Sequence, residues 1–266
     1  MPRASSPKAR IGAAFGCARE YDAQAAIQAE AARVLAGLVL ERGLPPHPSV
    51  LDMGCGTGNV ALALGGHTGQ GLYLCADLSP AMLARARGKL AEAGDHAPYA
   101  AHYAAMDAER PALRGAFDLV ISSMALQWTT NLAATVAGVW SLVRPGGLLA
   151  FALPGPETFR EWRQAHQRLG LACGLWEYPD ATALRAMLPA VAVTIREERR
   201  SVSFRRALDF PRHLKALGGF VPRPGHAPLP PVRFRAVLAE LDAVFPNGPR
   251  LTYQLFYALA SKPGQG

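Results

Sequence analysis

A short apolar segment that breaks into glycines is the part of this sequence best suited to chemistry. Val50–Met53 reads as a buried strand, and Asp52 lies within it. Three glycines follow at alternate positions: Gly54, Gly56 and Gly58. Without a Cβ, a glycine backbone can turn sharply and approach a ligand closely, and the predicted helix Asn59–Leu64 adds N-terminal N–H groups. This glycine loop, residues 54–58, is typical of a nucleotide-cofactor site after a first strand.

The glycine loop alone leaves two classes of cofactor open, because residues 56–61 also fit the G-x-G-x-x-G/A pattern of dinucleotide-binding folds. A second apolar strand, Leu72–Ala76, is followed by Asp77, which lies 19 residues after Gly58 (77 − 58). A carboxylate there would meet ribose hydroxyls of either cofactor. A pyrophosphate would bring negative charge close to Asp52, whereas S-adenosylmethionine carries a sulfonium and an amino group. The acids therefore favour S-adenosylmethionine.

A third acid, Asp107, follows the strand candidate Ala100–Met106, where an adenine amino group needs an acceptor. Five elements in order then resemble the class I S-adenosylmethionine-dependent methyltransferases: the glycine loop and segments 77–83, 106–108, 117–120 and 142–147. The resemblance covers about residues 49–153. The cofactor-binding residues expected within it are Asp52, Gly54, Gly56, Gly58, Asp77, Leu78, Met82, Asp107, Ala108 and Ser122, and Tyr21 in the N-terminal segment is expected to cap the cofactor.

Strand and helix patterns alternate around these motifs. Strands are expected at 50–53, 72–76, 117–121 and 148–153, with helices such as 80–93 and 132–142 between them. The alternation predicts an α/β fold, a Rossmann-like, seven-stranded and mostly parallel sheet with helices on both faces.

The flanking segments predict additions to this sheet. Residues 15–40 are alanine-rich and helix-prone, and a helix is expected at 157–169 after a proline-rich break. Strand patterns return at 191–204 and 251–259, with helices near 208–217 and 232–244 between them. We expect a flexible tail over 1–14 and a single domain over 15–266, with a cofactor-binding core at 49–153 and a helical lid built from about 154–190 and 207–245.

Composition fits one enzyme of 266 residues, 50% of them hydrophobic. No stretch approaches the roughly 18 apolar residues of a membrane span, and residues 1–10 lack the apolar core of a secretory signal. The four cysteines form no C-x-x-C pair and the seven histidines form no H-E-x-x-H motif, so we expect no metal site and no disulfide framework. A cytoplasmic location is expected.

Charge is concentrated in one segment. Residues 196–235 contain ten basic residues against three acids, a net +7 out of the formal +8 of the chain. Clustered cations attract an acidic partner. A solvated strand face is the alternative interpretation. The segment has no recognisable nucleic-acid-binding motif and few aromatic residues for base stacking beyond Phe204, Phe210, Phe220 and Phe234, so no nucleic-acid partner is expected.

Four further segments point to one particular family among these methyltransferases: 15–28, 122–128, 214–219 and 251–257. Together they resemble the malonyl-acyl-carrier-protein O-methyltransferases of biotin synthesis. The resemblance implies transfer of a methyl group from S-adenosylmethionine to the free carboxylate of a malonyl thioester on acyl carrier protein, leaving S-adenosylhomocysteine. It also implies no general base, because a carboxylate is already ionised at neutral pH.

Positioning groups would then do the catalytic work. Tyr21, Gln127 and Trp128 are candidates for closing the site. Lys215, Arg160 and Arg163 are candidates for receiving the malonyl carboxylate, since an arginine fork can bind both oxygens. A basic patch would face the acidic carrier protein: Arg199, Arg200, Arg205, Arg206 and Arg212.

Other functions remain open at this point. A related branch of the family that this sequence resembles is thought to hydroxylate a protein arginine. A cofactor-binding hydroxylase or assembly factor is therefore one alternative. A methyltransferase for another small carboxylate is a second, and a nicotinamide-dependent dehydrogenase is a third.

Overall fold

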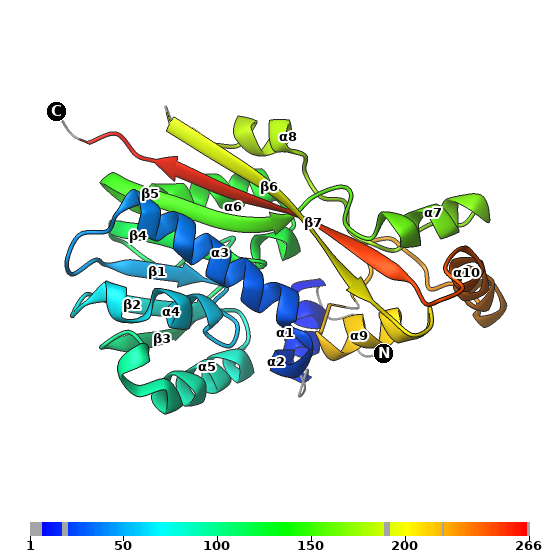
Figure 1. The fold of residues 1–266 in the computed structure, drawn as a ribbon. Helices are drawn as coiled ribbons and strands as arrows, with labels where there is room; N and C mark the ends of the chain where they lie inside the picture. Colours follow the sequence, from blue (N-terminus) through cyan, green and yellow to red (C-terminus); the bar gives the residue numbers. More distant parts are fainter. Residues whose placement is uncertain (1–6, 18–20, 189–191, 220, 265–266) are drawn as a thin grey trace, which may run out of the picture. The chain divides into compact units, whose positions relative to one another are not determined.

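A seven-stranded sheet organises the chain, with strand order β3-β2-β1-β4-β5-β7-β6 (Figure 1). The computed structural model describes residues 7–17, 21–188, 192–219 and 221–264. The strands are β1 (Val50–Met53), β2 (Tyr73–Asp77), β3 (Ala101–Ala105), β4 (Phe117–Ser123), β5 (Val143–Pro154), β6 (Ala192–Ser203) and β7 (Arg250–Ser261). The predicted α/β, Rossmann-like sheet is confirmed.

Ten α-helices and three short 3-10 helices connect the strands within the described residues. The α-helices are α1 (Pro7–Cys17), α2 (Tyr21–Gln24), α3 (Ala26–Arg42), α4 (Asn59–Leu64), α5 (Pro80–Ala93), α6 (Leu132–Ser141), α7 (Arg160–Arg168), α8 (Ala181–Ala186), α9 (Asp209–Ala216) and α10 (Pro231–Val244). The 3-10 helices are η1 (Gly65–Thr68), η2 (Gly94–His96) and η3 (Leu126–Trp128).

Parallel pairing aligns the carboxyl ends of the central strands. β1 pairs in parallel with both β2 and β4, so that Asp52 lies opposite Cys75 on one side and Ile121 on the other. β3 and β5 extend the parallel region outward. In Figure 1 the arrow of β7 runs opposite to those of β5 and β6. The glycine loop therefore leaves the sheet at the centre of its parallel part, where α/β folds hold their ligands.

Apolar side chains on one face of the sheet are buried against α6. Leu51 and Met53 of β1 share a buried cluster with Val136 and Val139 of α6, together with Leu149 of β5. The opposite face is covered by α3, which packs against α4 and β4. With both faces covered, the central strands read as nearly continuous apolar runs, as the sequence showed.

The chain divides into two compact units. The sheet unit comprises residues 25–153, 180–197 and 256–266, and the second unit comprises residues 1–24, 154–179 and 198–255. Residues 180–190, expected in the lid, belong to the sheet unit. Residues 15–17 and 21–24, within the helix-prone segment 15–40, belong to the second unit, whereas the sheet unit begins at Ala25. The boundaries of the predicted core and lid therefore need these corrections.

The N-terminal region also differs from its prediction. Pro7–Cys17 is helical, so the tail expected over 1–14 is too long. The helix-prone segment 15–40 contains the end of α1, α2 and most of α3, and Ala25, with φ −88° and ψ 33°, separates α2 from α3. Residues 1–6, Ala18, Val191 and Phe220, which also entered the predictions, lie outside the described residues.

No helix in the described part of the chain is long and apolar enough to cross a membrane. The same residues contain no group of three or more His, Cys, Asp or Glu side chains arranged to hold a metal ion.

Candidate functional site

The three glycines of the loop serve different purposes. A Cβ on Gly54 would lie 2.3 Å from the Cβ of Ala125, so Gly54 allows the loop to pack against the segment after β4. A Cβ on Gly56 would meet nothing within 4 Å. Gly56 and Gly58 have φ of +55° and +85°, a region that disfavours other residues. Packing thus accounts for Gly54, whereas Gly56 leaves its backbone open to a ligand.

Asp77, at the end of β2, is bound to the glycine loop. Its Oδ2 accepts a hydrogen bond from the Gly56 N–H at 2.9 Å, and its Oδ1 accepts one from the Ser79 N–H at 2.8 Å. Burial raises the pKa of this carboxyl, while the two backbone donors oppose the rise. Each carboxylate oxygen can accept a second hydrogen bond, so Asp77 keeps acceptor capacity for hydroxyl donors.

Asp52 lies below the loop and is completely buried. Its Oδ2 accepts a hydrogen bond from the Tyr73 hydroxyl at 3.2 Å, and its Oδ1 has no hydrogen-bond partner. Burial raises the pKa of Asp52 to about 7, with the Tyr73 bond lowering it and the nearby Asp77 charge adding to the rise. A buried carboxylate with an unpaired oxygen favours a nearby cation.

The end of β4 completes this edge of the sheet. Met124 has φ of +54°, an uncommon conformation for a residue other than glycine, and its N–H is bound to the Ala152 carbonyl at 2.9 Å. Gln127 donates from Nε2 to the Met124 carbonyl at 2.7 Å. The Ser122 Oγ and the Gln127 Oε1 are buried without a hydrogen-bond partner. Unpaired polar atoms therefore gather where β1 and β4 end.

The remaining cofactor candidates of the sheet unit lie at the ends of β2 and β3. The Met106 N–H donates to the Asp77 carbonyl at 2.9 Å, which ties the segment carrying Asp107 and Ala108 to the end of β2. Asp107 accepts the Glu109 N–H at 3.0 Å. Leu78 is 41% exposed and offers an apolar surface, whereas Met82 is only 2% exposed and belongs to the core. Met82 therefore supports the site from below.

These residues fit a ligand that combines a cation with a nucleoside. Asp77 offers acceptors for hydroxyls, Leu78 offers an apolar surface, and the unpaired Asp52 oxygen suits a positive charge. Gly56 leaves room for close approach of the ligand to the backbone. Near the loop, the Lys89 Nζ donates to the Asn59 Oδ1 at 2.7 Å.

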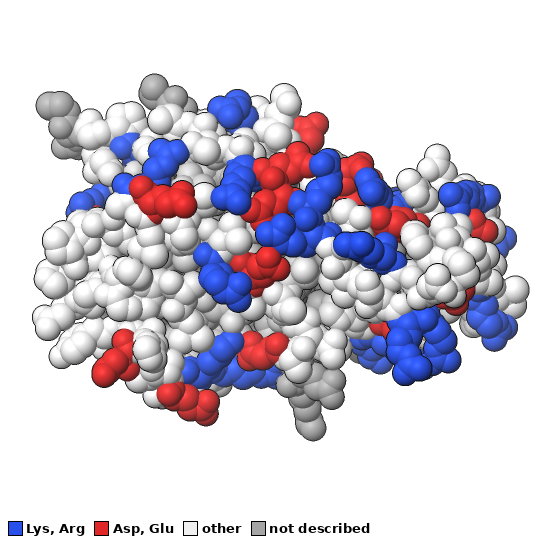
Figure 2. All heavy atoms as spheres, viewed as in Figure 1, with Lys and Arg blue, Asp and Glu red and all other residues white. Residues whose placement is uncertain are grey.

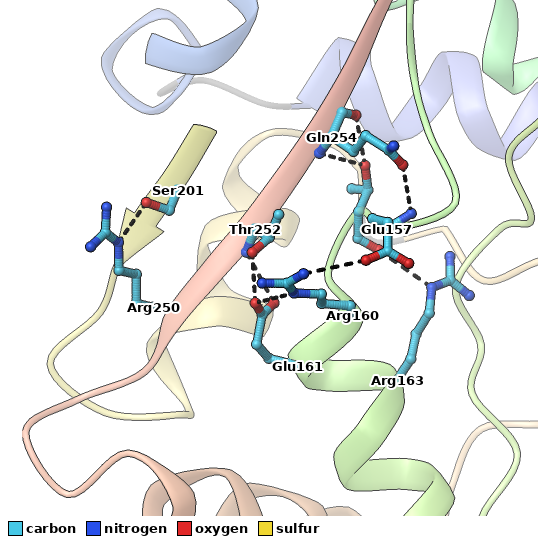
Figure 3. Close-up of polar contacts among 9 residues, drawn as sticks. Glu157, Arg160, Glu161, Arg163, Ser201, Arg250, Thr252 and Gln254 are labelled. Carbon is cyan, nitrogen blue, oxygen red and sulfur yellow. Dashed lines mark hydrogen bonds and ion pairs between the residues drawn. The ribbon is translucent and has the colours of Figure 1, made fainter. Parts of the chain in front are cut away.

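The second unit contains the predicted residues that lie outside the sheet unit. Tyr21 is half-buried at the start of α2, with its ring 6.3 Å from that of Phe15. Lys215 is exposed on α9. Figure 3 shows Arg160 between two acids, at 3.3 Å from Glu157 and 3.2 Å from Glu161. Arg160 therefore has two acidic partners beside it.

On the face drawn in Figure 2, basic side chains lie among acidic ones. Arg200 pairs with Glu198 at 2.8 Å, and Arg212 pairs with Asp209 at 3.5 Å. Arg199, Arg205 and Arg206 are exposed. The patch is therefore less positive than the count of arginines indicates.

Several contacting residues were not predicted from the sequence. Tyr73 donates a hydrogen bond to Asp52 and Ala125 lies against Gly54, yet each reads as an ordinary residue of its segment. Tyr178 lies near Arg163 in the second unit, with the Arg163 Cζ 6.0 Å from the centre of the Tyr178 ring.

Comparison with known proteins fixes the family. A family model described as a methyltransferase domain matches residues 51–149. A malonyl-acyl-carrier-protein O-methyltransferase of Magnetococcus marinus is 34% identical over 95% of this chain and 92% of that protein. The chain belongs to the malonyl-acyl-carrier-protein O-methyltransferase family. The resemblance inferred from the sequence is confirmed.

Other relatives of this methyltransferase carry more than one function. The biotin biosynthesis bifunctional protein BioCD of Bordetella avium is 38% identical over 97% of this chain, and the chain spans 53% of that relative's length. Among solved structures, the magnesium protoporphyrin IX methyltransferase of Synechocystis is 16% identical with a TM-score of 0.52, covering 97% of this chain and 99% of that one. The YcgJ protein of Bacillus subtilis has a TM-score of 0.60 at 14% identity, covering 87% and 99%. At these identities the structures support the fold alone.

Proposed function

We propose that this protein transfers a methyl group from S-adenosylmethionine to the free carboxylate of a malonyl thioester carried on acyl carrier protein. The observation that carries the proposal is the likeness to the Magnetococcus enzyme, which covers 95% of this chain and so includes segments from both units. Bifunctional relatives of biotin synthesis support a place in the same biosynthesis.

Each acid of the sheet unit has a role in this proposal. Asp77 accepts hydrogen bonds from the ribose hydroxyls while holding the Gly56 N–H. Asp107 accepts from the adenine amino group, and Leu78 packs on the adenine ring. Asp52, with Ser122 beside the loop, balances the positive charge of the amino acid portion. The Gly56 backbone contacts that portion directly, and Ala108 lines the adenine side.

When bound, S-adenosylmethionine supplies an electrophilic methyl group on a sulfonium. The chain does not need to remove a proton from the acceptor, because a carboxylate with a pKa near 4 is ionised at neutral pH. The chain instead orients the carboxylate and excludes water, which would otherwise weaken its attack. Asp77 also holds the Gly56 N–H of the glycine loop, so the donor side is preorganised.

Tyr21, Gln127 and Trp128 are proposed to close the site over the reactants. Gln127 is fixed by its bond to the Met124 carbonyl and retains a buried, unpaired Oε1 that can accept from a ligand. Tyr21, half-buried at the start of α2, is proposed as a contact of the cofactor. Such closure removes water from around the acceptor carboxylate.

Acyl carrier protein is proposed as the macromolecular partner. Arg199, Arg205 and Arg206 are exposed and suit an acidic protein. Lys215, exposed on α9, is assigned here to the same partner rather than to the malonyl carboxylate. These charges are proposed to speed the encounter with the carrier protein and to lower KM, without changing the rate of methyl transfer itself.

A methyl-transfer assay tests the proposal. Radiolabelled S-adenosylmethionine and malonyl-acyl carrier protein should give a labelled thioester that is released as monomethyl malonate on hydrolysis. Acetyl-acyl carrier protein, which lacks the free carboxylate, is the matched control and should stay unlabelled. Labelling of both substrates, or of neither, contradicts the proposed acceptor.

A further inference from the structure

Tyr73 brings a phenol into the buried centre of the sheet unit, next to Asp52. Both side chains are completely buried, and the Tyr73 hydroxyl donates to the Asp52 Oδ2 at 3.2 Å. In the register of β1 and β2, Asp52 lies opposite Cys75. Tyr73 is two residues before Cys75 and therefore lies on the same face of the sheet. The bond joins the two strands directly before the glycine loop begins.

The two oxygens of Asp52 have different surroundings. Oδ2 is held by Tyr73, whereas Oδ1 is buried and has no hydrogen-bond partner in the described part of the chain. A carboxylate that is taken out of water and given a single donor is costly in its charged form. The charge is kept only if the one donor is strong enough or if a ligand brings a positive group to Oδ1. Tyr73 thus supports the charge before a ligand binds.

The titratable groups around Asp52 differ in how they affect its charge. Burial raises the pKa of Asp52 to about 7, the Tyr73 bond lowers it, and the Asp77 charge adds to the rise. Burial and the Asp52 charge keep the pKa of Tyr73 well above its usual value, so the phenol remains a donor. The hydrogen bond with Cys75, burial and the Asp52 charge raise the pKa of Cys55, so this thiol stays neutral.

The elements packed against β1 bring no second donor to Asp52 within the described residues. On β4 its register partner is the apolar Ile121, and Asp118 is bound at the opposite end of β1, where it accepts from the Ser49 N–H at 2.8 Å. The helix α4 has no charged residue. The charged residues of the other two helices on this face are half-buried or exposed: Glu30, Arg33, Glu41 and Arg42 of α3, and Arg85, Arg87, Lys89 and Glu92 of α5. Tyr73 is therefore the described neighbour that favours the ionised form of Asp52.

We propose that Tyr73 is a positioning residue for the methyl donor: its phenol keeps Asp52 ionised near neutral pH, so that the free Oδ1 can meet the positive charge of the donor's amino acid portion. Tyr73 does not contact the donor in this proposal and acts through Asp52. The inference rests on the donor-binding part of the proposed function and is independent of the acceptor. It implies that binding releases a proton to the solvent from those molecules in which Asp52 is protonated.

Proton release by the wild-type protein is the first test. The probe is S-adenosylhomocysteine, which retains the amino group of the donor, and calorimetry in buffers of different ionisation enthalpy counts the protons. With the pKa of Asp52 at about 7 in the free protein, binding should release about nine-tenths of a proton at pH 6 and about half a proton at pH 7. Binding without proton release at both pH values would overturn the proposal without the need for a variant.

Tyr73→Phe removes the hydroxyl and keeps the ring. The pH at which affinity for S-adenosylhomocysteine is half-maximal should rise by about one pH unit. At pH 7 the affinity should fall about fivefold and proton release should rise to about nine-tenths, whereas at pH 9 the two proteins should agree within about threefold. Tyr103→Phe is the matched control. Tyr103 is the register partner of Cys75 on β3, and its ring lies 4.9 Å from the Arg87 Cζ. This control should retain the wild-type pH profile.

A purely structural role for the phenol predicts a different pattern. Tyr73→Phe would then weaken binding equally at every pH and leave proton release at the wild-type value, which would overturn the proposal. In an Asp52→Asn background, Tyr73→Phe should cause no further pH-dependent loss, because the amide does not ionise. A loss at pH 7 equal to that in the wild-type background would show that Tyr73 acts independently of Asp52, and would also overturn the proposal.

Failure of this proposal and failure of the proposed function give different results. Full methyl transfer to malonyl-acyl carrier protein, with the wild-type pH profile of S-adenosylhomocysteine binding in Tyr73→Phe, would remove the role of Tyr73 and keep the function. A Tyr73-dependent pH profile in a protein that labels no malonyl thioester would keep the role of Tyr73 and remove the function.

Discussion

Replacing Gly54 by alanine should destabilise the sheet unit in a way that a second substitution reverses. The added Cβ would lie 2.3 Å from the Ala125 Cβ, closer than real side chains approach. Overpacking of this kind costs about 1–3 kcal/mol. The backbone at φ +74° adds a penalty of about 1–2 kcal/mol for a residue other than glycine. Gly54→Ala should therefore lower the free energy of unfolding by about 2–5 kcal/mol, a large share of the 5–15 kcal/mol typical of a domain.

Urea unfolding of four proteins separates the two costs: wild type, Gly54→Ala, Ala125→Gly and the double variant. The double variant removes the atom that the new Cβ would meet, so the clash should disappear and the backbone penalty should remain. The coupling energy of the cycle then equals the clash, about 1–3 kcal/mol. Gly56→Ala is the matched control, since its Cβ would meet nothing within 4 Å and only the backbone penalty applies. Strictly additive effects at Gly54 and Ala125 would refute the reasoning.

Three further predictions concern the cofactor acids and the basic patch. Asp77→Ala should weaken S-adenosylmethionine binding at least about 100-fold by calorimetry, because it removes acceptors for the ribose and frees the Gly56 N–H; unchanged affinity removes the central site assignment. For Asp52, the pKa of about 7 lies above that of the unfolded chain, so the unfolded chain releases the proton first. Stability of the ligand-free protein should therefore fall as pH rises from about 4 to about 7. In unfolding experiments between pH 5 and 8, Asp52→Asn should show a smaller decrease in the free energy of unfolding than the wild type. An equally steep decrease would mean that another group causes it. Charge reversal at Arg199, Arg200, Arg205 and Arg206 should raise KM for the carrier-bound substrate, more so at low salt, and leave malonyl-pantetheine unaffected. Equal losses with both substrates would exclude a docking role for the patch.

The central fold was predictable because its signals are local. Val50–Met53, Asn59–Leu64 and Pro80–Ala93 begin and end at the predicted residues, since glycines, an N-terminal proline and continuous apolar runs mark their limits. The strand β5 begins five residues earlier than predicted, at Val143, because Val143 pairs with Phe117 of β4 and the Gly147 carbonyl accepts the Lys262 N–H after β7. Tertiary pairing there overrides local turn signals.

The parts of the site that escaped prediction depend on contacts between distant residues. Tyr73 approaches Asp52 across two paired strands, and Ala125 approaches Gly54 from the end of a third. Neither contact leaves a spacing pattern in the sequence. Arg160 and Arg163 lie three residues apart on one helix and look equivalent in the sequence. They differ only because Glu157 and Glu161 surround the first and backbone carbonyls hold the second.

The two compact units also follow from long-range assembly. The second unit combines the N-terminal helices with α7, α9 and α10, segments that lie far apart in the sequence. Gln24 and His213 show this assembly directly, since the His213 Nδ1 lies 3.0 Å from the Gln24 Oε1 across 189 residues. Helical periodicity predicts that such helices exist, but it does not predict which of them pack together.

Methyl transfer to malonyl-acyl carrier protein tests the central claim most directly. With labelled S-adenosylmethionine, the wild-type protein should label the malonyl thioester at its free carboxylate, and Asp77→Ala should not. Absence of label in the wild-type reaction, with S-adenosylmethionine binding intact by calorimetry, would contradict the account.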